Sequence, residues 1–97
     1  MVTPIPDAAL IKAVVRGHDW AARLLNGDVG SLADIAREAG VTARYVSRLV
    51  RYAFLAPDVV EAILSGIQPA RLTVDSLKNG IPLDWAEQRE CFGLLEQ

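Results

Sequence analysis

Polar and apolar residues alternate over the first third of the chain with the period of an α-helix. The polar positions recur at steps of four and three, at Lys12, Arg16, Asp19, Arg23 and Asn26. Apolar residues such as Leu10 and Val14 occupy the opposite side of the same helical wheel. The pattern therefore predicts one amphipathic support helix over residues 7–26, which ends at a glycine.

Two shorter helices are predicted to follow over residues 31–53, separated by a very short turn. Ser31 can cap the free amides of the first helix, and Thr42 those of the second. Gly40 lies between them and tolerates a positive φ. The second helix is predicted to run from about Thr42 to Arg51.

Side chains with a packing role support this two-helix unit. The stretch LADIAREAGVTARYVSRLVR matches the helix-turn-helix pattern, with small, glycine and apolar residues in register. Ile35 and Val46 are expected to fill the space between the helices, and Ala36 must be small where they cross. Val41 and Leu49 complete the predicted buried set.

The remainder of the chain is predicted to form a C-terminal helical extension over residues 57–95. Pro57 suits the first turn of a helix, a short helix is expected after Thr73, and a last helix follows Asp84. Trp85 and Phe92 lie seven residues apart in that last helix and are expected to be core residues.

These elements define the expected fold class. No strand-like alternation is visible, and 97 residues with 52% hydrophobic content are enough for one core. The prediction is an all-α fold, a compact bundle of about five to six short helices containing a helix-turn-helix, in a single domain over residues 1–97.

The second helix of the pair carries a polar stripe with a defined chemistry. At about 100° per residue, Arg44, Ser47, Arg48 and Arg51 fall within an arc of roughly 100°, opposite the apolar side. Arginine pairs bidentately with guanine in the major groove or grips phosphates, and hydroxyl groups reach bases or backbone. The pattern predicts a recognition helix for double-stranded DNA. The candidate DNA-binding residues are Thr42, Ala43, Arg44, Tyr45, Ser47, Arg48 and Arg51.

The charge distribution bears on this prediction more than the formal net charge of −2 does. Residues 1–56 carry seven Lys or Arg against five Asp or Glu, whereas residues 57–97 carry three against seven. No acidic residue occurs from Ala39 through Pro57. A phosphate surface responds to this local field rather than to the total charge.

Tyr45 and Tyr52 lie seven residues apart on the flank of the stripe. Each phenol can bond a phosphate or a base edge. The alternative is that both rings pack against a neighbouring helix and keep their hydroxyl groups in water.

Other function classes find little support. His18 and Cys91 are the only residues of their types, too few for a three- or four-ligand metal site. No glycine-rich phosphate loop, catalytic constellation or membrane-spanning run is visible. We therefore expect no enzyme activity, no cofactor, no metal, no small-molecule substrate and no membrane partner. The expected location is the cytoplasm, in association with the nucleoid.

The chain also resembles a known family. The run SLADIAREAGVTARYVSRLVRYAFLAPDVVEAILSGIQPARLTV, followed by IPLDWAEQRECFG, is similar to the C-terminal region of bacterial and phage site-specific recombinases of the resolvase/invertase (serine) class. The likeness covers roughly residues 7–93. It implies the site-binding domain of a recombinase, because in that family an N-terminal domain supplies the serine nucleophile, and nothing in these residues resembles that domain. VTARYVSRLVRYAFLAPDVVEAILSG also looks like the helix-turn-helix of ParB-type partition proteins.

Several alternatives remain open from the sequence. The chain can be a part of a longer recombinase, with a catalytic domain as its partner, or a free-standing relative, either monomeric or self-associating. Within DNA binding, a small transcriptional regulator or a partition-type protein is the second interpretation. A third is a protein-interaction module on a helix-turn-helix scaffold, in which the acidic residues 57–97 contact the partner.

Overall fold

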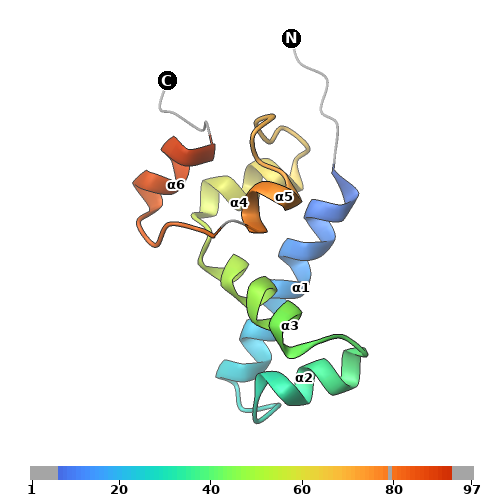
Figure 1. Cartoon of the computed structure of the whole chain (residues 1–97). Helices are drawn as coiled ribbons and strands as arrows, with labels where there is room; N and C mark the ends of the chain where they lie inside the picture. The colour runs from blue at the N-terminus through green and yellow to red at the C-terminus, as the bar shows by residue number, and fades with distance from the viewer. Residues whose placement is uncertain (1–6, 79, 93–97) are drawn as a thin grey trace. The chain divides into compact units, whose positions relative to one another are not determined.

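The computed structural model describes residues 7–78 and 80–92 (Figure 1). Within these ranges the protein is all-α and contains no strand, which confirms the predicted fold class. The helices are α1 (Ala8–Leu25), α2 (Leu32–Ala39), α3 (Ala43–Val50), the 3-10 helix η1 (Arg51–Phe54), α4 (Pro57–Leu64), α5 (Val74–Lys78) and α6 (Trp85–Phe92). Residues 93–95 of the predicted C-terminal extension lie outside the described residues.

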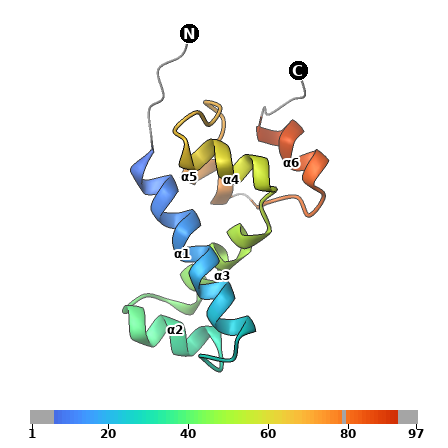
Figure 2. The same cartoon turned by 180° about the vertical axis from the view of Figure 1, so that it is seen from behind.

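The described residues form two compact units. Residues 13–53 make up the helix-turn-helix unit, and residues 7–12 together with 54–92 make up the C-terminal unit. Helix α1 is continuous (Figure 2). Its residues up to Lys12 belong to the C-terminal unit, and those from Ala13 on belong to the helix-turn-helix unit. None of the described helices is both long and apolar enough to span a membrane.

Local capping sets the ends of the two short helices in the helix-turn-helix unit. The Ser31 hydroxyl accepts a hydrogen bond from the Asp34 amide at 3.2 Å, and Thr42 Oγ1 accepts one from the Tyr45 amide at 3.1 Å. Gly40 has φ 70°, in the left-handed region, and its amide donates to the Ala36 carbonyl. These contacts confirm both predicted caps and the predicted turn.

Helices α2 and α3 pack against each other over this turn, with the C-terminal part of α1 supporting them. Ile35 and Val46 are fully buried and Ala36 is nearly so, as the helix-turn-helix pattern predicts. The buried apolar residues of the unit are Ala13, Val14, Trp20, Ile35, Ala36, Val46, Leu49 and Tyr52.

Gly17 brings the backbones of α1 and α3 together. A Cβ atom at this position would lie 3.0 Å from the carbonyl carbon of Leu49 and closer still to its carbonyl oxygen. Such an approach leaves no room for any side chain. Gly17 therefore sets how closely α1 can approach α3.

The C-terminal unit is organised around a buried amide. Gln88 is fully buried, and its Oε1 accepts a hydrogen bond from the Ala56 amide at 2.7 Å. Its Nε2 donates to the carbonyl oxygens of Phe54 at 3.0 Å and Pro82 at 2.7 Å. One side chain thus satisfies three backbone groups from two separate loops. The pattern analysis did not single out Gln88, although it shares a helical face with Trp85 and Phe92.

The two aromatic residues of α6 have different environments. Phe92 is 1% exposed, which confirms its predicted core role. The prediction for Trp85 is wrong, because its side chain is 48% exposed. Its indole nitrogen donates to the Phe54 carbonyl at 3.2 Å, so the ring lies over the end of η1 rather than inside the core.

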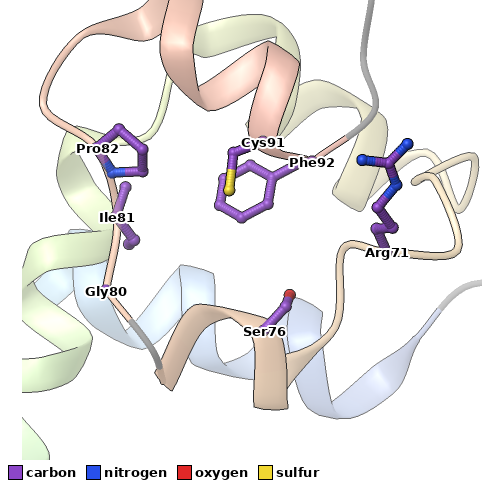
Figure 3. A pocket seen from close by; sticks show the side chains of 7 residues that line it. All are labelled: Arg71, Ser76, Gly80, Ile81, Pro82, Cys91 and Phe92. Atoms are coloured by element: carbon purple, nitrogen blue, oxygen red, sulfur yellow. The ribbon is translucent and has the colours of Figure 1, made fainter.

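An open hollow of about 660 Å³ lies in the C-terminal unit (Figure 3). Cys91 and Phe92 of α6 border it on one side and Ser76 of α5 on the other. The Ser76 hydroxyl donates to the Thr73 carbonyl at 2.8 Å and accepts from the Thr73 amide at 2.9 Å. Both interactions serve the start of α5, so this hydroxyl is occupied in the fold.

Candidate nucleic-acid interface

The start of α3 presents three of the predicted DNA-binding residues. Thr42, Ala43 and Arg44 are all exposed, and the Thr42 side chain also caps the helix. The Thr42 hydroxyl keeps its own hydrogen for a further acceptor, because capping uses only its oxygen. The N-terminal turn of the helix therefore offers a hydroxyl, a methyl group and a guanidinium group to solvent.

Arg51 is the second exposed guanidinium group of the predicted stripe. Helix α3 ends at Val50, one residue earlier than predicted, and Arg51 opens the 3-10 helix η1. Within the described part of the chain, neither Arg44 nor Arg51 forms an ion pair. Both positive charges are therefore available to a partner.

Arg48 departs from the predicted exposure. It is half-buried, and its guanidinium carbon lies 5.3 Å from the centre of the Tyr45 ring. Its Nε is buried and meets no hydrogen-bond partner among the described residues. Tyr45 lies three residues before Arg48, so the two side chains share one face of α3. The Tyr45 ring therefore covers part of the Arg48 side chain. Ser47, the fourth member of the stripe, is also half-buried.

Tyr45 belongs to a chain of contacts that reaches α1. The rings of Tyr45 and Trp20 have centroids 6.3 Å apart and planes at 75°, an edge-to-face arrangement. The guanidinium carbon of Arg16 lies 5.7 Å from the centre of the Trp20 ring. Arg16, Trp20, Tyr45 and Arg48 thus form one array, called here the cation–aromatic array, with a cation at each end.

Tyr52 lies in the core rather than on the flank of the stripe. It is 1% exposed, and its hydroxyl finds no hydrogen-bond partner within the described ranges. Burial raises the pKa of this hydroxyl above its ordinary value, and the nearby positive charge of Arg48 offsets part of the rise. Both rings therefore pack within the fold, Tyr45 against Trp20 and Tyr52 in the core, but the Tyr52 hydroxyl does not reach water as the packing alternative expected.

The acidic residues of α2 are paired with other cations. Glu38 binds Arg23 of α1 at 2.8 Å, and Asp34 binds Arg37 at 3.3 Å. The hydrogen bond that Arg23 donates to Glu38 holds the pKa of Arg23 above its ordinary value. These pairs neutralise Arg23 and Arg37, whereas the arginines of α3 keep their charge. The unpaired positive charge of the unit therefore concentrates on α3 and on Arg16.

Sequence reasoning missed Arg16 and Trp20 as neighbours of the residues predicted to bind DNA. A signal was present, because the two residues are four positions apart in a helix and so share a face. What the pattern could not supply is the contact between Trp20 and Tyr45, which depends on how α1 and α3 pack. Among the described residues, no three side chains of the His, Cys, Asp and Glu types lie close enough to hold a metal ion.

Comparisons of the chain with protein-family models, with curated proteins and with solved structures find no match. The resemblance to the recombinases therefore rests on the sequence segments quoted above.

Proposed function

We propose that the protein is a sequence-specific DNA-binding domain that inserts α3 into the major groove. In helix-turn-helix proteins the second helix lies in the groove, and its N-terminal residues contact base edges. Arg44 occupies that place here, exposed in the first turn of α3. Arg51, which directly follows the end of α3, is suited to a phosphate.

The observation that carries this proposal is the unpaired positive charge of α3. In α2, by contrast, Arg37 pairs with Asp34, an acidic residue of the same helix. The arginines of α3 have no such partner within the described residues, and no acid occurs from Ala39 through Pro57. A polyanion supplies the missing partner, and the major groove of duplex DNA is wide enough to admit an α-helix.

We further propose that the chain is the DNA-binding domain of a site-specific recombinase and does not itself catalyse strand exchange. This finer assignment is supported only by the resemblance of the segments SLADIAREAGVTARYVSRLVR, LAPDVVEAILSG and LDWAEQR in their joint order. A small regulator or a partition-type protein would use the same α3 surface, so the test of DNA binding below applies to each of them.

The test is a fluorescence titration of labelled mixed-sequence duplex DNA at two salt concentrations. Binding should weaken steeply with salt, because each neutralised phosphate releases counterions. The variant Arg51→Ala should bind more weakly and with a smaller salt slope. Lys78→Ala is the matched control, since it also removes one positive charge but from the C-terminal unit, where Lys78 pairs with Asp75. Equal binding by both variants would contradict the proposal.

A second candidate is a protein-interaction module. It is favoured by large apolar side chains that the C-terminal unit leaves exposed, among them Phe54, Leu83 and Trp85. Trp85 lies directly against the Phe54 backbone, so these two form a continuous surface. Sedimentation of the parent protein and of Phe54→Ser over a range of concentrations tests self-association through this surface. A parent that binds no DNA but self-associates, with the variant staying monomeric, would favour this candidate.

A further inference from the structure

The cation–aromatic array connects α1 to the recognition helix through rigid contacts. Trp20 is only 5% exposed, and its ring meets Tyr45 edge to face. Arg16 and Arg48 lie over these rings at 5.7 and 5.3 Å, within the distance at which cation–π attraction is significant. Two guanidinium groups on different helices are thereby held in one relative position.

The charges at the two ends of the array are not neutralised by the fold. Arg16 forms no ion pair in the described part of the chain, even though Asp19 lies one turn later on the same helix. Stacking on a ring uses the face of a guanidinium group and leaves donors along its edge for an acceptor. An acceptor such as a phosphate oxygen can therefore bind without displacing the stack.

We propose that the array extends the DNA-binding surface from α3 onto α1, with Arg16 contacting a backbone phosphate and the Trp20–Tyr45 pair positioning Arg16 and Arg48. This inference rests on the proposed function. It assigns Arg16 a role in binding all sequences alike, because a phosphate contact carries no base information. It assigns Tyr45 a positioning role through its ring.

The first experiment measures DNA affinity and salt slope for Arg16→Ala, Arg16→Lys, Arg44→Ala and Lys78→Ala. Arg16→Ala should lose about two- to fivefold in affinity on every duplex, the range for one exposed ion pair. Its salt slope should fall by about 0.9. Arg16→Lys should keep the parental slope, because it keeps the charge. Intrinsic Trp20 fluorescence in a Trp85→Phe background reports that each variant is folded, since these are the only two tryptophans.

The outcomes separate the two proposals. If Arg44→Ala weakens binding while Arg16→Ala behaves like Lys78→Ala, the extension onto α1 is wrong and the function of α3 stands. If neither arginine variant weakens binding, or the parent does not bind DNA, both proposals are wrong. Loss of slope in Arg16→Lys as well as in Arg16→Ala would show a packing role only and would also overturn the phosphate contact.

The second experiment tests positioning by Tyr45 with a double-mutant cycle. Tyr45→Phe keeps the ring, so Arg48→Ala should cost the same affinity in this background as in the parent. Tyr45→Leu removes the ring, so Arg48→Ala should cost at least twofold less there. Equal costs in all three backgrounds, with folded variants, would show that Tyr45 does not position Arg48.

Discussion

Replacement of Gly17 by alanine tests whether α1 supports α3 through direct backbone packing. The added Cβ would lie 3.0 Å from the Leu49 carbonyl carbon, closer still to its oxygen, and 3.3 Å from Tyr52 Cβ. A backbone carbonyl inside a helix cannot rotate away as a flexible side chain can. The two helices must therefore move apart, which opens the packing around Leu49, now 2% exposed.

The expected cost follows from two opposing terms. Alanine in place of glycine inside a helix stabilises by about 1 kcal/mol. Overpacking a closed interface costs about 1–3 kcal/mol and sometimes more, and a rigid backbone neighbour places Gly17 at the upper end of that range. We expect a net loss of about 2 kcal/mol. In urea this corresponds to a midpoint lower by about 1–2 M for a unit of this size.

The assay is urea unfolding followed by Trp20 fluorescence in a Trp85→Phe background. Gly30→Ala is the matched control, because its Cβ would meet only the flexible Asp34 carboxylate, at 3.2 Å. That variant should leave the midpoint unchanged or raise it slightly. A midpoint for Gly17→Ala equal to or above the parental value would refute the close packing of α1 on α3.

Three further predictions concern buried or paired polar groups. Tyr52→Phe removes a buried hydroxyl without a partner, so it should stabilise by up to about 1–2 kcal/mol in urea unfolding, and a clear loss would contradict this. Burial raises the pKa of Tyr52 in the folded protein, so the hydroxyl ionises at lower pH in the unfolded chain. The free energy of unfolding of the parent should therefore fall as the pH rises above the ordinary pKa of 10.0, and Tyr52→Phe should lack this decline. Gln88→Leu leaves the Ala56 amide and the Pro82 carbonyl unsatisfied, whereas the Phe54 carbonyl keeps the hydrogen bond from Trp85. The variant should cost about 2 kcal/mol or more, measured through Trp85 fluorescence; an unchanged midpoint would show that water replaces the side chain. The hydrogen bond from Arg89, 2.6 Å long, lowers the pKa of Asp58, so this pair stabilises above the ordinary pKa of 3.8 and is lost as the pH falls below it. Asp58→Asn should reduce this loss of unfolding free energy at acid pH by less than about 1 kcal/mol. An identical dependence of stability on pH in parent and variant would count against the pair.

The parts of the fold that depend on neighbouring residues were predictable. Ser31 and Thr42 cap helices because a hydroxyl at that place reaches an amide three residues on, and Gly40 ends α2 because its φ is positive. The same holds for the short helix after Thr73, where Thr73 Oγ1 accepts from the Ser76 amide at 3.1 Å. These features need no knowledge of the tertiary packing.

The parts that depend on helix packing were not predictable from the pattern. A helical wheel places Arg48 on the outer side of α3. It cannot show that the Tyr45 ring packs against Trp20 of α1 and that the Arg48 guanidinium group lies over this ring. Likewise, an aromatic residue in an amphipathic pattern is expected to be buried, whereas Trp85 lies half-exposed over a loop carbonyl. Gln88 is buried although it is polar, because two loops bring three backbone groups to it.

The central claim is that α3 reads DNA sequence in the major groove, and selection of binding sites from a random duplex library tests it most directly. The parent should enrich a defined site containing guanine, because an exposed arginine at the start of a recognition helix pairs with its O6 and N7. Arg44→Ala, which removes an exposed side chain, should fold normally, lose the preference at one position and bind its best site about 1–3 kcal/mol more weakly. No enriched site for the parent, or the same site enriched equally by Arg44→Ala, would contradict the account.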